Sequence, residues 1–140
     1  MKLLVPVDGS DHALKAAKKA AGLVREGGGE VILLSVAHDI TPLGVWEIGH
    51  REGILRDLEA KAQAAVDGAK KVLKAEGVEA RASLIETGAP ADEIIRVAKE
   101  EAVDVIVMGS RGLTGLPHYL LGSVAHKVVT YAPCSVLVVK

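Results

Sequence analysis

Short apolar runs alternate along this chain with longer stretches in which apolar residues recur at helical spacing. The apolar runs predict five β-strands, at residues 2–7, 30–36, 79–86, 104–108 and 135–139. The stretches between them predict helices at residues 11–26, 50–76, 90–101 and 118–131. Such alternation is typical of parallel strands joined by right-handed crossovers. We therefore expect an α/β fold with three layers, a doubly wound, five-stranded parallel sheet with helices on both faces.

Local signals at the ends of these segments support the prediction. Ser10 is placed to cap the first helix, and the glycines at 27–29 can end it. Pro90 suits an early position in the third helix. The strand at 79–86 alternates apolar and polar residues more than the others, which indicates a partly exposed position at the sheet edge.

Composition narrows both the fold and the partners. Hydrophobic residues make up 49% and charged residues 25% of the 140 residues, so we expect residues 1–140 to form one globular domain. With no Phe, one Trp and two Tyr, its core must be aliphatic. A net charge of −1 and the scarcity of aromatic rings argue against a nucleic-acid partner.

The sequence also indicates where the protein works. No apolar stretch approaches the roughly 20 residues that span a membrane, so we expect no membrane partner. The single cysteine, Cys134, cannot form an internal disulfide, and its simplest interpretation is a small buried hydrophobe. Both observations favour the cytoplasm.

One long irregular connection, residues 37–49, follows the second strand. It leaves the carboxyl end of that strand, the end at which doubly wound sheets bind their ligands. A connection of this length is either functional, as a lid or a subunit contact, or simply flexible.

Glycines cluster directly after the apolar strand at 104–108. Glycine lets backbone N–H groups approach a phosphate closely, and the N-terminus of a following helix favours an anion. Ser123, in the following helical stretch, can donate a hydroxyl and Arg111 a forked cation to phosphate oxygens. Tight connections between strands and helices also use glycine, so this segment alone leaves both interpretations open. Its glycines are Gly109, Gly112, Gly115 and Gly122.

A carboxylate, Asp8, ends the first strand. If the chain winds outward through strands two and three and then crosses to strands four and five, the strand order is 3-2-1-4-5. Asp8 and Gly109 then face one crevice at the switch point of the sheet. Asp8 can accept hydrogen bonds from ribose hydroxyls, hold a cation beside phosphates, or cap the first helix.

The whole chain resembles the universal stress protein family in its single-domain form. The family's nucleotide-binding pattern, Gly-x2-Gly-x9-Gly-Ser, occurs with its spacing intact at Gly109, Gly112, Gly122 and Ser123. The segments at residues 5–10, 31–36 and 133–139 also match the family. The family branch that does not bind ATP lacks the glycine pattern, so the resemblance places this chain with the nucleotide binders.

The resemblance implies a role for individual residues. The backbone at the position of Val36 meets the adenine, and the positions of Asp8, Met108 and Gly109 surround the ribose. The phosphates lie against the positions of Gly112, Gly122, Ser123 and Val124. The predicted ligand is ATP or AMP. Mg²⁺ held through the phosphates near Asp8 is a further option, and no side chain is assigned as a metal ligand. The predicted binding residues are Pro6, Val7, Asp8, Val36, Met108, Gly109, Arg111, Gly112, Gly122, Ser123 and Val124.

The last strand, at 135–139, is apolar and falls at a sheet edge, which leaves its backbone groups unpaired in a monomer. The resemblance implies a two-fold dimer formed by this strand, while burial under local loops is the alternative.

Three functions remain open at this point. The first is a sensor in the stress response that binds ATP or AMP and whose nucleotide state alters the dimer or its contacts. The second is a slow ATP hydrolase or phosphotransferase, for which no general base is evident, so an enzyme is the weaker hypothesis. The third is an interaction dimer that works without a nucleotide. A P-loop, Gly-x4-Gly-Lys-Ser/Thr, does not occur in the sequence.

Overall fold

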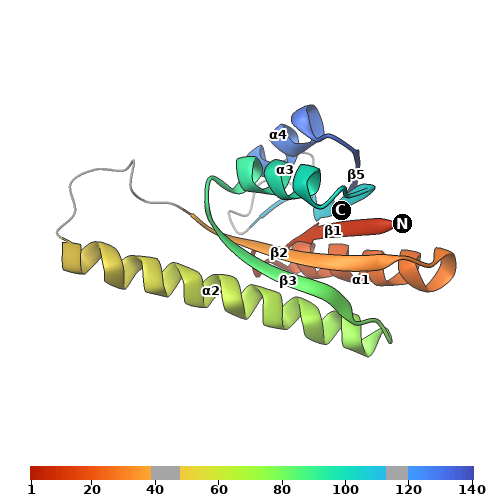
Figure 1. Cartoon of the computed structure of the whole chain (residues 1–140), viewed down its shortest axis with the longest axis horizontal. Coiled ribbons are helices and arrows are strands. Elements are labelled where there is room, and N and C mark those ends of the chain that lie inside the picture. Colours follow the sequence, from red (N-terminus) through yellow and green to blue (C-terminus); the bar gives the residue numbers. More distant parts are fainter. Residues whose placement is uncertain (39–47, 113–119) are drawn as a thin grey trace.

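Five parallel strands form one sheet in the order β3-β2-β1-β4-β5 (Figure 1). The computed structural model describes residues 1–38, 48–112 and 120–140. The predicted architecture and strand order are confirmed. The strands are β1 (Lys2–Pro6), β2 (Glu30–His38), β3 (Ala80–Gly88), β4 (Val105–Gly109) and β5 (Ser135–Val139), and the helices are α1 (Asp11–Gly27), α2 (Ile48–Ala75), α3 (Pro90–Glu100) and α4 (Ser123–Tyr131).

Alternate residues of the strands supply two separate aliphatic cores, one on each face of the sheet. Leu3 and Val107 pack with α1 and α2, whereas Leu4 and Ile106 pack with α3 and α4. Figure 1 shows the two pairs of helices on opposite sides of the sheet. All four of these side chains are fully buried, and each such burial contributes about 1.5–3 kcal/mol to folding. The cores therefore fix the sheet, whose carboxyl edge is the one that carries Asp8 and the glycine segment.

Helix ends confirm three predictions and correct one. Gly28, one of the predicted glycines, is the C-cap residue of α1. The Ser10 side chain caps α1 by accepting a hydrogen bond from the N–H of Ala13, and Pro90 is at the start of α3. The helix predicted at 118–131 begins only at Ser123, and Gly122 is its N-cap residue rather than an interior one. Residues 118 and 119 lie outside the described residues.

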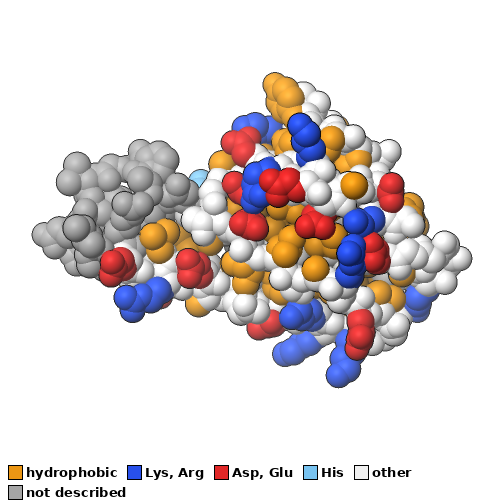
Figure 2. Space-filling view, viewed as in Figure 1, with side chains coloured by type: hydrophobic (Ala, Val, Ile, Leu, Met, Phe, Trp, Pro, Cys, Tyr) orange, Lys and Arg blue, Asp and Glu red, His pale blue; other side chains and the backbone are white. Residues whose placement is uncertain are grey.

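The two edges of the sheet differ in their chemistry. Strand β3 forms one edge of the sheet, as predicted. Charged side chains lie along it: Arg81 of β3 forms an ion pair of 2.9 Å with Glu30 of the neighbouring strand β2. Figure 2 shows acidic and basic side chains interspersed over this face of the molecule. Strand β5 is the other edge, carries no charged side chain and keeps its residues partly exposed. The second edge is therefore the one that lacks charged protection against pairing.

Other expectations are only partly met. Cys134 is half-buried against the core under α3 and α4, not fully buried as predicted. The connection predicted at 37–49 is shorter, since β2 continues to His38 and α2 begins at Ile48. The rest of that connection, residues 39–47, lies outside the described residues. Among the described helices, none is long and apolar enough to cross a membrane.

Candidate functional site

A cavity of about 190 Å³ opens at the carboxyl edge of the sheet, between β1, β2 and β4 and the first turns of α3 and α4. The topology creates it, because the crossovers from β1 to β2 and from β4 to β5 run in opposite directions and diverge at this point. Every residue that the sequence predicted for the site lines this cavity. They are Pro6, Val7, Asp8, Val36, Met108, Gly109, Arg111, Gly112, Gly122, Ser123 and Val124.

Asp8 lies beside the glycine segment, as predicted from the strand order. Strands β1 and β4 are hydrogen-bonded neighbours, and Oδ2 of Asp8 is 2.8 Å from the point that a Cβ atom on Gly112 would occupy. Oδ1 of Asp8 accepts a hydrogen bond of 2.9 Å from the N–H of Ser10. Because Ser10 supplies the helix cap, the alternative that Asp8 caps α1 is wrong. Asp8 instead shapes the turn that precedes the helix and presents its other oxygen to the cavity.

A side chain would meet different neighbours at each glycine of the motif. A Cβ on Gly109 would lie 2.7 Å from Cβ of His12, so this glycine lets α1 pass close to β4. A Cβ on Gly122 would lie 3.3 Å from the carbonyl oxygen of Ser110, which accepts a hydrogen bond of 2.8 Å from the N–H of Gly122. Gly112 meets only the end of the Asp8 side chain. Of the three glycines, Gly112 is therefore the one whose substitution disturbs the cavity most and the fold least.

The N-terminus of α4 is open toward the cavity. Gly122 supplies no side chain to cap it, whereas Ser10 caps α1. The first N–H groups of a helix have no partner within the helix and carry the positive end of its dipole. Ser123 and Val124, which carry two of these groups, line the cavity. The arrangement suits an anion.

The cavity has two ends of different chemistry. At the polar end, around β1, β4 and α4, the side chains with hydrogen-bonding groups are Asp8, Ser10, Ser110, Arg111 and Ser123. At the apolar end, over β2 and under α3, the side chains are Leu34, Val36, Pro90 and Ile94. Because β1 separates β2 from β4, the two ends lie about 10 Å apart. A ligand with an anionic part and an apolar, flat part matches this division.

Several lining residues were not predicted from the sequence. The amphipathic pattern of the third helix indicates that Ile94 is buried, but no sequence signal says that its helix forms a cavity wall. Ser110 has no signal beyond its place in the glycine segment. The additional residues are Ser10, Ala13, Leu34, Pro90, Ile94, Ser110 and Ala125.

Ionisable groups at the site are few. Asp8 is the one carboxylate among the described lining residues, and no group of three His, Cys, Asp or Glu side chains that could hold a metal occurs in residues 1–38, 48–112 and 120–140. Cys134 is not a lining residue, and burial raises the pKa of its thiol. The raised pKa favours the protonated form of this thiol near neutral pH, which is the less reactive form.

The sequence matches the model of the universal stress protein family over residues 1–140. The chain belongs to this family. A universal stress protein of Methanocaldococcus jannaschii is 41% identical over 140 residues, which cover 99% of this chain and 81% of the relative. A second, from Bacillus subtilis, is 35% identical over 146 residues and is covered to 98%.

Solved universal stress proteins share the fold. The structure of the one from Lactobacillus plantarum superposes with a TM-score of 0.81 at 28% identity and covers all of this chain. Three further structures, at 23–24% identity and TM-scores of 0.67–0.75, contain a nucleotide. They are a universal stress protein with cAMP, one from Arabidopsis thaliana with AMP and one from Archaeoglobus fulgidus with dAMP.

Proposed function

We propose that this universal stress protein binds an adenine nucleotide, ATP or AMP, in the cavity at the carboxyl edge of the sheet, and acts as a nucleotide-dependent sensor in the stress response. The observation that carries the proposal is the polar end of the cavity. There, the uncapped N-terminus of α4, Gly112 and the Asp8 carboxylate lie side by side.

The polar end suits the phosphates and the ribose. The N–H groups of Ser123 and Val124 supply donors to phosphate oxygens, and the Ser123 hydroxyl adds another. The exposed oxygen of Asp8 can accept from ribose hydroxyls, or contribute to holding a Mg²⁺ ion that the phosphates bring with them. Mg²⁺ usually takes only one or two carboxylates from a protein and fills its other positions with phosphate oxygens and water. A single carboxylate is thus compatible with a metal that arrives with the nucleotide.

The apolar end suits the base. Val36, Pro90 and Ile94 offer an aliphatic surface to a flat ring. The relatives solved with cAMP, AMP and dAMP all hold an adenine. Their shared ligand chemistry supports adenine over other bases in the proposed site.

Calorimetric titration of the purified protein with ATP and AMP, with and without Mg²⁺, tests the proposal. We expect saturable binding with one site per chain. If the protein retains nucleotide through purification, denaturing the protein should release that nucleotide into the supernatant. Absence of binding for both nucleotides, in protein that gives a cooperative unfolding transition, would contradict the proposal.

Asp8→Asn is the variant that tests the site itself. Asparagine keeps an oxygen for the N–H of Ser10 but removes the charge, so the turn before α1 is preserved while Mg²⁺-dependent affinity falls. Gly122→Val is a poorer test of the site, because the new Cβ atom would lie only 3.3 Å from the carbonyl oxygen of Ser110. Lost binding in that variant would not separate the ligand from the fold.

Hydrolysis is the second candidate activity, and the described residues give it little support. Asp8, the one described carboxylate at the cavity, is already engaged by the N–H of Ser10. A general base needs a basic atom within reach of the attacking water. Release of inorganic phosphate at saturating ATP, measured for the wild type and for Asp8→Asn, decides the matter. Wild-type turnover that Asp8→Asn abolishes even when ATP is saturating would establish an enzyme.

A homodimer formed through β5 is a further part of the proposal. The strand is at the sheet edge, has no charged residue and leaves Val136 to Val139 partly exposed. Sedimentation should show a dimer, and Val138→Lys should shift it to monomer because a lysine blocks pairing at an edge. Thr87→Lys, on the opposite edge strand β3, is the control and should leave the dimer intact. We also place the protein in the cytoplasm, where a lone cysteine stays reduced.

A further inference from the structure

Ile94 is the most deeply buried side chain that α3 contributes to the cavity. It is 3% exposed and belongs to the core that also contains Leu34 and Met108, two other lining residues. Pro90, four residues earlier on the same face of α3, extends the same wall. The wall is therefore part of the hydrophobic core and not a mobile surface feature.

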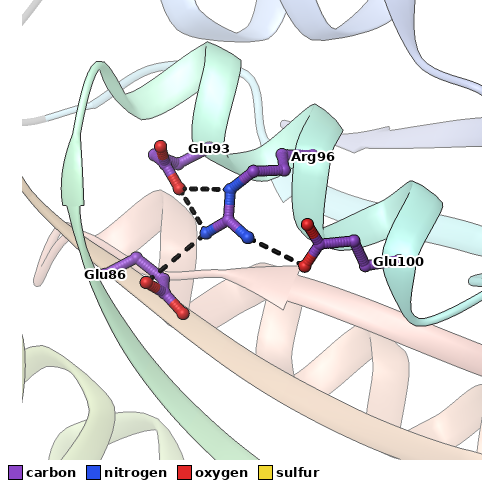
Figure 3. A network of polar contacts seen from close by, with 4 residues as sticks. All are labelled: Glu86, Glu93, Arg96 and Glu100. Carbon is purple, nitrogen blue, oxygen red and sulfur yellow. Dashed lines mark hydrogen bonds and ion pairs between the residues drawn. The ribbon is translucent and has the colours of Figure 1, made fainter.

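An ion-pair network fastens α3 to the end of β3 (Figure 3). The Arg96 guanidinium donates hydrogen bonds to Glu93 and Glu100 on its own helix and lies 3.4 Å from Glu86 of β3. The Glu93 side chain also packs over Gly88, where a Cβ would come within 2.9 Å of it. The first turns of α3 are thus held against the strand that precedes them.

A second ion pair fastens the same part of α3 to α4. Asp92, in the first turn of α3, forms an ion pair with Lys127 on α4, in which Oδ1 of Asp92 is 2.8 Å from Nζ of Lys127. Helix α3 is therefore tied on both sides, to β3 and to α4. These contacts outside the cavity help to hold α3 in place over the apolar end.

The geometry points to Ile94 as the residue that selects the base of the nucleotide, by limiting the width of the apolar end with Pro90. This inference rests on the proposed nucleotide binding. No described side chain at the apolar end can donate or accept a hydrogen bond, so side chains there discriminate between bases by shape and by the cost of desolvation. Backbone groups remain available to read the edge of the base.

Guanine is the purine that this arrangement should reject. It carries an amino group and a carbonyl oxygen where adenine has a hydrogen and an amino group. A polar group buried against aliphatic side chains without a partner loses its hydrogen bonds to water and destabilises the complex. A smaller side chain at position 94 widens the apolar end, so that water can enter or the extra polar group of guanine has room. The free-energy cost of binding guanine then falls.

Calorimetry with three probes tests the inference: ATP, GTP and inorganic tripolyphosphate, titrated into Ile94→Val and Ile94→Ala. We expect ATP affinity to fall about threefold in Ile94→Val and about tenfold or more in Ile94→Ala. The ratio of ATP to GTP affinity should fall by about threefold or more in Ile94→Ala. Tripolyphosphate affinity should stay within about twofold of the wild type, because this probe occupies only the polar end.

Matched controls separate selection from loss of stability. Ile32→Val removes the same methyl group from the same core, and Val97→Ala shortens another buried residue of α3; neither residue lines the cavity. Both controls should keep the wild-type ratio of ATP to GTP affinity. Ile94→Val, which loses a single methyl group, keeps the test available if Ile94→Ala does not fold.

The possible failures are distinguishable. If the wild type binds neither ATP nor GTP, the proposed function itself is wrong. If ATP binds but the ratio of ATP to GTP affinity in the Ile94 variants equals that of the wild type, the assignment to Ile94 is overturned. A parallel loss of ATP and tripolyphosphate affinity would also overturn it, since the substitution would then act on the whole site.

Discussion

The polar end and the apolar end of the cavity are built from different parts of the chain. The polar end consists of backbone N–H groups, glycines and short polar side chains, held by turns around Asp8 and Gly112. The apolar end consists of side chains such as Ile94 that belong to the hydrophobic core. Substitutions at the apolar end therefore cost folding stability as well as affinity. At the polar end, the two costs can be separated residue by residue.

The largest effect should come from Gly109→Ala, and it should be an effect on folding. The new Cβ would lie 2.7 Å from Cβ and 2.8 Å from the carbonyl carbon of His12, so α1 must move away from β4. We expect a loss of about 2–3 kcal/mol in the free energy of unfolding, measured with urea.

Gly22→Ala is the matched control for Gly109→Ala. Nothing lies within 4 Å of its Cβ position, and it sits inside α1, so alanine should stabilise the protein by about 0.5–1 kcal/mol. Equal stability of the two variants would show that Gly109 is not required by the packing of α1.

The next effect should come from Gly112→Ala, and it should be an effect on binding. The new Cβ displaces the carboxylate end of Asp8, which rotates easily, so unfolding should change by less than about 1 kcal/mol. ATP affinity should fall about tenfold, as measured by calorimetry. The double variant with Asp8→Asn should lose less than the sum of the two single losses, because both changes act on one carboxylate. Additive losses would contradict the contact between these residues as the cause.

A smaller effect is expected for Ser123→Ala, which removes a hydroxyl from the first residue of α4. Affinity for ATP and for tripolyphosphate should fall together, by about fivefold, which corresponds to one lost hydrogen bond. This parallel loss contrasts with the selective loss of ATP affinity expected for Ile94→Val. Ser83→Ala, on β3 and outside the cavity, is the control and should leave both affinities unchanged.

The smallest effect should come from Arg96→Met, which removes the ion pairs of α3 but keeps much of the side-chain volume. Its side chain is 40% exposed, so solvent screens these pairs. We expect ATP affinity to fall by no more than about twofold at low salt and to match the wild type at about 0.5 M NaCl, where such pairs are screened. A tenfold loss that persists at high salt would show that the network sets the cavity far more strongly than its exposure indicates.

Local patterns carried most of the fold. The apolar runs predicted all five strands, and the alternation at 79–86 predicted an edge position for β3. The helix predicted at 118–131 was predicted to begin too early, because Leu120 and Leu121 extend the apolar pattern of the helix toward the N-terminus. In the structure these two residues are 46% and 37% exposed and precede the N-cap residue of α4. An apolar pattern does not distinguish a helical residue from an exposed one just before the helix.

The sequence by itself determined the five strands and their alternation with helices, since hydrophobic periodicity is a property of neighbouring residues. The strand order was an inference from how such chains wind, and the residues around the carboxyl edge came from the match to the family's glycine pattern. The tertiary structure alone decided that Ile94 and Pro90 form the opposite wall, because that depends on how α3 packs across β2. It also decided why each motif glycine is a glycine. Gly109 has no room for a Cβ atom because His12, on a helix nearly a hundred residues earlier in the chain, lies against it. A contact between residues so far apart in the sequence cannot be predicted from the local pattern.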